Sequence, residues 1–212
     1  MTATSEIFRL TAIVPAAGRS SRMVRFKPLL SWPPDTANGA TVIESTIRSI
    51  RSGLLRIHPI EWNIIVVCGH RLPEMSLLLR ARFDDIRVIE NPDPDAPMSS
   101  SIKCAMPEAL EGSYIMVLPG DHPAVRSDTI REVVRKAMSE PGSIVVPLYN
   151  GRRGHPVVFP PHLHARLARP DPDLGLRAIM HDPDEVVEAI ETGDPGILLN
   201  LDYPSDYRTR NS

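Results

Sequence analysis

The chain has few cysteines, no long apolar stretch and almost no net charge, and each shortage excludes a class of protein. Two cysteines among 212 residues are too few for a disulfide framework or a cysteine-based metal cluster, which favours a reducing cytoplasmic setting. No apolar run approaches the roughly 18 residues that a membrane helix needs. The formal net charge of −2 gives no general attraction for nucleic acid or an anionic membrane, so we expect neither as a partner. Glu6 and Arg9 lie where a signal peptide would be apolar, and we interpret the N-terminus as mature sequence.

Proline, in contrast, is abundant, with 22 residues. Each proline removes a backbone donor and fixes φ, so a protein of long uninterrupted helices is excluded. A hydrophobic share of 42% with so little net charge argues against a disordered chain. Because the length is typical of about one domain, we predict a single domain over residues 1–212 that is built from many short elements.

Apolar, β-branched runs alternate with helical patterns along the chain. An almost wholly apolar composition is typical of strands buried on both faces of a parallel sheet. The predicted strands are Leu10–Val14, Ile64–Cys68, Ile86–Ile89, Tyr114–Leu118, Ile144–Pro147, Pro156–Phe159, Val186–Ile190 and Ile197–Leu201. The predicted helices are Val42–Ser52, Glu74–Arg82, Ser100–Met106 and Asp128–Met138. This alternation predicts a three-layer α/β domain with a mostly parallel central sheet.

Two of the predicted helices carry signals at their ends. Thr41 and Glu44 form the pattern of a capping box at the start of the first helix, and Gly53 is a plausible stop at its end. Ser127 is the predicted N-cap of the last helix.

The segment after the first strand is suited to phosphate groups. In open α/β sheets, ligands bind beyond the carboxyl ends of the strands. Small residues at such a strand end let backbone N–H groups approach an anion, and here they are Ala16, Ala17 and Gly18. Arg19, Arg22 and Lys27 add three cations within nine residues, and Lys27 is one of only three lysines in the chain. The alternative is an ordinary strand–helix turn with solvated arginines.

The familiar nucleotide-binding motifs are absent from the sequence. It contains neither G-x-G-x-x-G nor G-x-x-x-x-G-K-[ST], so dinucleotide-dependent dehydrogenases and P-loop ATPases are poor fits.

Two carboxylates follow other strands at the same edge of the predicted sheet. Asp121 follows Tyr114–Leu118 in a Pro-Gly-Asp-His-Pro turn, and Asp202 follows Ile197–Leu201. Facing a cluster of cations, such a pair suggests Mg²⁺ held between the protein and phosphates. For each residue alone, a helix N-cap or a turn is the alternative. His155, in a Gly-His-Pro turn, either faces a second substrate or makes a structural hydrogen bond.

Five segments in this order resemble the molybdenum-cofactor nucleotidyltransferases, and within that family the molybdopterin cytidylyltransferases. They are Val14–Met23 with Lys27–Leu30, Asn91 through Ser101, Leu118–Pro123, Gly154–Phe159 and Leu201–Tyr207. The ordered set spans almost the whole chain. A PAAG opening also resembles the methylerythritol-phosphate cytidylyltransferases, but Gly-Asp-His-Pro replaces their His-Asp-Ala-Ala-Arg segment.

The resemblance implies a Rossmann-like nucleotidyltransferase fold and a role for each matching residue. The Ala16–Arg22 loop would embrace the nucleoside triphosphate, with Lys27, Arg19 and Asp121 as catalytic residues and Asp121 and Asp202 as Mg²⁺ ligands. The base would be recognised with the help of Ser99, Ser100 and Ser101. The pterin would face His122, Gly154 and His155. Ala17, where guanylyltransferases of the family carry glycine, favours CTP.

Four features depart from the family pattern. Val24 and Pro97 replace glycines, His122 replaces the more common glutamine, and the loop Ser31–Ala40 is longer than usual. None of these departures removes a charged residue from the proposed centre.

The resulting hypothesis is Mg²⁺-dependent transfer of CMP from CTP to molybdopterin, with release of pyrophosphate. One alternative is an enzyme that uses GTP or another small phosphorylated acceptor. A second is a non-catalytic nucleotide- or pterin-binding chaperone for a molybdenum-dependent dehydrogenase. A third is a generic Rossmann-like interaction domain.

Overall fold

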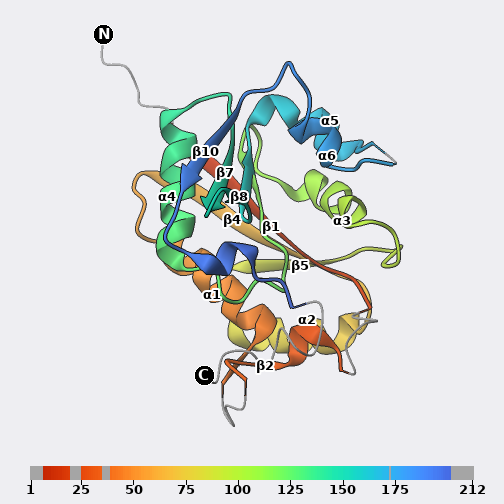
Figure 1. Ribbon diagram of the computed structural model, residues 1–212. Coiled ribbons are helices and arrows are strands. Elements are labelled where there is room, and N and C mark those ends of the chain that lie inside the picture. The colour runs from red at the N-terminus through yellow and green to blue at the C-terminus, as the bar shows by residue number, and fades with distance from the viewer. Residues whose placement is uncertain (1–6, 20–24, 35–38, 172, 202–212) are drawn as a thin grey trace.

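A mixed sheet of eight strands runs through the part of the chain that the computed structural model describes, which is residues 7–19, 25–34, 39–171 and 173–201 (Figure 1). The strands are β1 (Phe8–Ala16), β4 (Ile60–Cys68), β5 (Ile86–Glu90), β6 (Tyr114–Val117), β7 (Ile144–Tyr149), β8 (Arg152–Arg153), β9 (Val157–Phe159) and β10 (Val187–Glu191). Their order is β10-β7-β9-β6-β1-β4-β5, with β8 paired to β7. β8 and β9 are antiparallel to their neighbours and the other ladders are parallel, so the prediction of a mostly parallel sheet is confirmed.

Helices cover both faces of the sheet and give the predicted three layers. The helices are α1 (Val42–Leu54), α2 (Leu72–Arg82), α3 (Met98–Ala105), α4 (Ser127–Ser139), α5 (His164–Ala168) and α6 (Arg177–Met180). Short 3₁₀ turns occur at η1 (Lys27–Leu29), η2 (Met106–Glu108), η3 (Pro161–Leu163) and η4 (Pro195–Leu198), and β2 (Ser31–Trp32) pairs with β3 (Ala40–Thr41). In Figure 1, α1, α2 and α4 lie on one side of the sheet and α3, α5 and α6 on the other. Within the described residues, no helix is long and apolar enough to cross a membrane.

β1 shows why the central strands are mostly apolar on both faces. Leu10, Ala12 and Val14 pack into the core beneath α1 and α4, whereas Ile13 packs into the core beneath α3 and α5. All four side chains are fully buried. Because both faces are covered, alternation of polar and apolar residues is lost, as expected for a central parallel strand.

The start of α1 follows the prediction, but its end does not. The Thr41 N–H donates to Glu44 Oε2 at 2.7 Å and the Glu44 N–H donates to Thr41 Oγ1 at 3.3 Å, which confirms the capping box. Gly53 lies inside the helix, so its prediction as the helix stop is wrong. A Cβ there would lie 2.7 Å from the backbone oxygen of Ser127 and 2.9 Å from Ile130, so this glycine allows α4 to pack closely against α1.

The carboxylate of Asp194, which is distant from α4 in the sequence, explains two other wrong predictions. Ser127 lies inside α4 rather than at its N-cap, because Asp194 Oδ2 accepts from the Arg126 N–H and from Thr129 Oγ1, both at 2.8 Å. The predicted strand Ile197–Leu201 is not a strand, and η4 takes its place. Asp194 also accepts from the Gly196 N–H at 2.9 Å through Oδ1, which stabilises that turn.

Candidate functional site

A cavity of about 220 Å³ lies at the carboxyl ends of β1 and β6, where the sequence predicts the ligand. Three segments of the chain line it: the end of β1 with the following turn and η1, the loop before α3 with its first turn, and the turn after β6. The lining residues are Pro15, Ala16, Ala17, Gly18, Lys27, Pro28, Pro94, Ala96, Met98, Ser101, Pro119, Gly120 and Asp121. Most of the predicted nucleotide-binding residues are therefore around one cavity.

The floor of this cavity is fixed by backbone contacts between neighbouring strand ends. The Gly120 N–H donates to the Pro15 carbonyl at 2.9 Å, and the His70 N–H donates to the Ala17 carbonyl at 3.1 Å. A Cβ at Gly120 would lie 2.7 Å from Ile43 Cδ1 and 3.1 Å from Ala16 Cβ, so the turn before Asp121 packs closely against α1 and the end of β1. The ends of β1, β4 and β6 are thereby held together around the cavity.

Lys27 and Asp121, two of the three predicted catalytic residues, meet at this floor. Lys27 Nζ donates to Asp121 Oδ2 at 2.9 Å, and the side chains are only 11% and 25% exposed. Asp121 Oδ1 lies 3.0 Å from His122 Nδ1. Burial would raise the pKa of the Asp121 carboxyl, but the hydrogen bond and charge of His122, together with Lys27, hold that pKa well below its usual value. The carboxylate is therefore ionised across the physiological pH range.

His122 lies between the Asp121 carboxylate and a second histidine, His155. Their rings pack edge to face, with centroids 5.0 Å apart and planes at 78°. His155 Nδ1 is buried and forms no hydrogen bond within the described part of the chain. Burial lowers the pKa of His155 to about 4, and repulsion from the His122 ring acts in the same direction. His155 is therefore a neutral ring at neutral pH.

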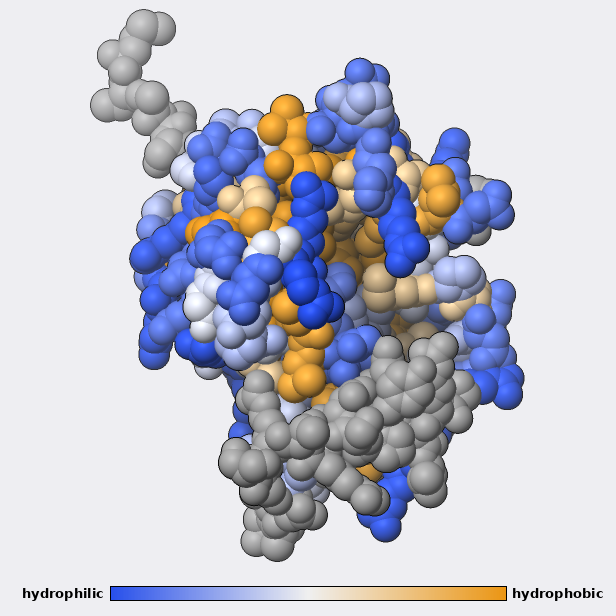
Figure 2. Space-filling model, viewed as in Figure 1, coloured by the Kyte–Doolittle hydropathy of each residue, from blue (hydrophilic) through white to orange (hydrophobic). Residues whose placement is uncertain are grey.

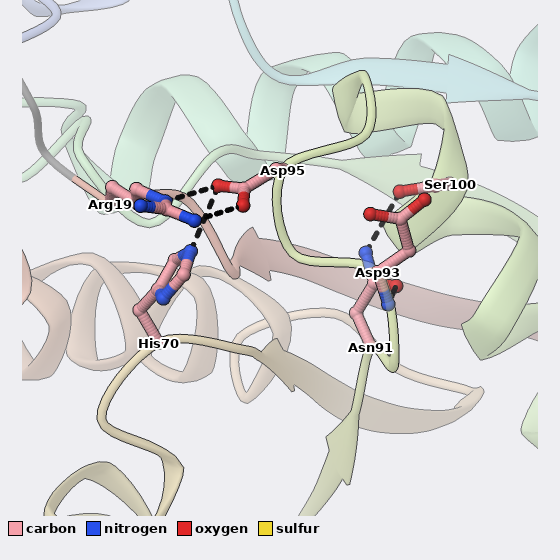
Figure 3. Close-up of polar contacts among 6 residues, drawn as sticks. All are labelled: Arg19, His70, Asn91, Asp93, Asp95 and Ser100. Atoms are coloured by element: carbon pink, nitrogen blue, oxygen red, sulfur yellow. Dashed lines mark hydrogen bonds and ion pairs between the residues drawn. The ribbon is translucent and has the colours of Figure 1, made fainter.

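Arg19, the third predicted catalytic residue, pairs with a carboxylate at the rim of the cavity (Figure 3). Its Nε donates to Asp95 Oδ1 at 2.5 Å, and a second guanidinium nitrogen bonds to Oδ2. His70 Nε2 lies 3.0 Å from the same Oδ1. Hydrogen bonds from Arg19 and His70 lower the pKa of Asp95 to about 2. Since the Arg19 and Asp95 side chains are 62% and 50% exposed, an incoming phosphate can compete for Arg19.

The three predicted serines occupy the first turn of α3 but have different surroundings. Ser101 lines the cavity, whereas Ser99 lies close to Gly175 in the loop before α6. The Asn91 amide donates to Ser100 Oγ at 2.8 Å (Figure 3) and to Ser101 Oγ at 3.1 Å. The Asn91 Oδ1 accepts from the Asp93 N–H at 3.0 Å. Asn91 is only 2% exposed, so it holds the loop and the helix start together.

The turn that carries Gly154 and His155 is fixed by η4. The His155 N–H donates to the Ile197 carbonyl at 3.1 Å, and the Gly154 N–H donates to the Pro147 carbonyl at 3.0 Å. A Cβ at Gly154 would overlap the backbone oxygen of Ile197, so only glycine fits. The structure thus places His155 beside His122, at the margin of the cavity.

Two predicted residues, Arg22 and Asp202, lie outside the described residues. The described part of the chain contains no group of three or more His, Cys, Asp or Glu that could hold a metal by itself. Asp121 is the predicted metal ligand that the structure describes.

Three site residues were not assigned a role from the sequence: Asn91, Asp95 and His70. For Asn91 a signal exists, since an Asn-Pro-Asp loop favours a turn in which the Asn side chain accepts from a backbone N–H two residues on. Asp95 and His70 belong to separate loops that only the tertiary structure brings to Arg19.

Known proteins share this fold and sequence pattern. The MobA-like NTP transferase domain family matches residues 12–187. The molybdenum cofactor cytidylyltransferase of Escherichia coli strain K12 is 30% identical over 201 residues, which is 94% of each chain.

Solved structures agree on the fold. Rv0371c from Mycobacterium tuberculosis H37Rv superimposes with a TM-score of 0.75 at 24% identity, over 96% of this chain and 97% of that one. A manganese complex of the same protein gives a TM-score of 0.69, at 24% identity over 94% and 96% of the two chains. The 4-diphosphocytidyl-2C-methyl-D-erythritol synthase of Anaerococcus prevotii gives 0.68 at 15% identity, over 95% and 93% of the two chains.

Proposed function

From the premise that this chain belongs to the family of MobA-like NTP transferase domains and is a nucleotidyltransferase, we propose that it transfers CMP from CTP to molybdopterin and releases pyrophosphate. The observation that carries the proposal is the Lys27–Asp121 pair on the floor of the cavity at the strand ends. The cytidylyltransferase from E. coli, at 30% identity over nearly the full length, favours CTP and the molybdenum cofactor as substrates.

The triphosphate fits the cation side of the cavity. Lys27 supplies a positive charge at the floor, and the backbone of Ala16–Gly18 lines the same space. Nucleotidyl transfer needs positioning and charge neutralisation more than covalent participation of the protein, and this arrangement provides both.

Asp121 fits a Mg²⁺ ion. Its carboxylate is ionised and lies at the cavity floor, and each of its oxygens keeps lone pairs besides the bonds to Lys27 and His122. Mg²⁺ is usually bound by one or two carboxylates together with substrate phosphates. When bound, the ion would neutralise charge on the reacting phosphates. Asp202 stays the predicted second ligand, and the manganese complex of the M. tuberculosis protein supports a divalent ion in this fold.

The transfer itself requires no general base. A phosphate monoester loses its second proton with a pKa of about 6 and is mostly dianionic at neutral pH. One of its oxygens attacks the α-phosphorus of CTP and forms a new P–O bond. The bond between the α-phosphorus and the bridging oxygen breaks, and that oxygen leaves with the electron pair as part of pyrophosphate. Lys27 lowers the repulsion between the two anions.

A thermal-shift panel with the four ribonucleoside triphosphates and Mg²⁺ tests the nucleotide. Ligand at about 100 times its Kd stabilises the protein by about 2.7 kcal/mol, which for a domain of this size raises Tm by about 5–11 °C. We expect the largest shift with CTP. A preference for GTP would contradict the cytidylyl assignment, and no shift with any triphosphate would contradict nucleotide binding.

Pyrophosphate release with CTP, Mg²⁺ and molybdopterin tests the reaction. We expect Asp121→Ala to lower kcat by about 10²–10³-fold and Lys27→Ala mainly to raise the KM for CTP. Near-normal turnover of Asp121→Ala at saturating Mg²⁺ would refute the metal assignment. CTP binding without pyrophosphate release would favour the chaperone or another acceptor. A cytoplasmic location and delivery to a dehydrogenase stay predictions from the sequence.

A further inference from the structure

β8 and β9 form two parts of one interrupted strand beside the site. Both pair antiparallel with β7, and the segment 154–156 separates them. β9 also pairs with β6, whose carboxyl end leads to Asp121. β8 therefore continues the line of β9 beyond the end of β6, and Arg153 lies two positions before His155 in the chain. Its two residues, Arg152 and Arg153, have no role in the mechanism so far.

The register of β7 with β8 separates the two arginines. In an antiparallel pair, residues directly opposite each other project from the same face of the sheet. Arg153 lies opposite Leu148 and Arg152 lies opposite Tyr149. The side chains of Arg153 and Arg152 therefore project from opposite faces.

The alternation along β7 shows which face each arginine takes. Ile144 and Val146 pack into the core beneath α3, α5 and α6, whereas Val145 packs into the core on the other face. Leu148 continues the row of Ile144 and Val146, because side chains alternate with a period of two. Arg153 thus projects from the face that α3, α5 and α6 cover, and Arg152 from the face of α4.

This face of the molecule is hollowed next to β8. Figure 2, in the orientation of Figure 1, shows a recess between β8 and the helices α3, α5 and α6. Apolar residues colour its interior, and strongly hydrophilic side chains colour its edges. Such a recess suits a ligand with a ring body and an anionic group.

The hairpin that carries the arginines is held in a fixed shape. Asn150 and Gly151 both have positive φ angles, 50° and 72°, as in the two-residue turns that join antiparallel strands. The Asn150 N–H donates to Glu191 Oε1 at 3.0 Å. At the other end, Gly154 donates to the carbonyl of Pro147 at 3.0 Å. The backbone of β8 therefore loses little conformational entropy when a ligand binds.

Both arginines are exposed, and neither forms an ion pair or a side-chain hydrogen bond with a described residue. In contrast, Arg166 on α5 is held by Asp182 and Glu185. A guanidinium without a protein carboxylate is available for a phosphate, which it can bind through two parallel hydrogen bonds.

We propose that Arg153 binds the phosphate group of the acceptor and selects acceptors that carry a phosphate monoester. This inference rests on the proposed nucleotidyl transfer. Two anions must approach each other in that reaction. Lys27 compensates the charge of the triphosphate, and Arg153 compensates that of the acceptor. The attacking oxygen stays free while the guanidinium holds two other oxygens of the same phosphate.

The test compares Arg153→Ala with Arg152→Ala, a matched control one residue away on the opposite face. Because hydrogen bonds to charged groups are among the stronger ones, Arg153→Ala should raise the KM for molybdopterin by about 10–100-fold. The KM for CTP and the Tm should stay at wild-type values. Arg153→Lys should recover part of the affinity, and Arg152→Ala should change the KM for molybdopterin by less than about twofold. Equal effects of the two alanine variants would refute the proposal.

Direct binding of molybdopterin, followed by its fluorescence without CTP, keeps the test independent of turnover. Weaker binding by Arg153→Ala supports the proposal even if the wild type releases no pyrophosphate, a result that refutes only the proposed transfer. Equal binding by wild type and Arg153→Ala, or no binding by the wild type, refutes the role of Arg153. A molybdopterin analogue without the phosphate should bind the wild type and Arg153→Ala equally.

Discussion

The loss of stability on replacing Asn91 can be worked out from its hydrogen bonds. Its amide donates to Ser100 and Ser101 and its oxygen accepts from the backbone of Asp93, with donor–acceptor distances of 2.8, 3.1 and 3.0 Å. At 2% exposure, water cannot replace the lost contacts without entering the site. Each hydrogen bond contributes about 0.5–1.5 kcal/mol net. We expect Asn91→Ala to lower the free energy of unfolding by about 3 kcal/mol.

Thermal denaturation measures this loss. For a domain of this size, 3 kcal/mol corresponds to a fall in Tm of about 6–12 °C. CTP binding should weaken as well, because Ser101 lines the cavity and loses its support. Asn91→Asp keeps the acceptor for the Asp93 N–H but removes both donors to the serines, so its loss should be intermediate.

Asn63 offers a matched control for the same substitution. Its amide makes one hydrogen bond, to the Glu108 carbonyl at 3.3 Å, and within the described residues its buried Oδ1 has no partner. Asn63→Ala should therefore cost less than about 1 kcal/mol and leave CTP binding unchanged. Similar losses in Asn63→Ala and Asn91→Ala would refute the view that the hydrogen bonds of Asn91 hold the start of α3.

Two further predictions concern charge. Asp95→Asn should release Arg19 for the triphosphate and lower the KM for CTP by about two- to fivefold, less so at high salt; a higher KM would show instead that the pair positions the loop. In the folded protein the pKa of His155 is lowered from 6.5 to about 4, so the unfolded chain binds more protons between these values. The metal-free protein should therefore lose stability as the pH falls from 6.5 towards 4, and His155→Gln should flatten that part of the curve. The free energy of unfolding would be measured by urea denaturation at each pH. If it depended on pH equally in the wild type and in His155→Gln, the burial of a neutral His155 would be contradicted.

The sequence allowed prediction of those parts of the fold that depend on local patterns. Strands buried on both faces are apolar, and the Thr41–Glu44 capping box follows from residues three positions apart. The proximity of Lys27 and Asp121 could also be predicted, since the carboxyl ends of parallel strands meet at one edge of the sheet.

The wrong or missing predictions involve partners that are distant in the sequence. Ser127 has the properties of an N-cap, but the N-cap is Arg126, whose N–H donates to Asp194, 68 positions away. Arg19 could be recognised as a cation beside the small-residue turn after β1, whereas its pairing with Asp95 requires the positions of two separate loops. Ile197 has the apolar, β-branched side chain that is typical of strands, but Pro195 and the carboxylate of Asp194 favour a tight turn. Local composition contains no information on such contacts.

η4 has a consequence for the order in which the enzyme assembles. It follows every other described element in the chain, yet the preceding Asp194 accepts hydrogen bonds from Arg126 and Thr129 at the start of α4, and Ile197 supports the turn of His155. The chain is synthesised from its N-terminus, so every segment of the nucleotide side, at the ends of β1, β4 and β6, is available before η4. The turn of His155 therefore receives its support last, after all the segments that line the cavity have been made.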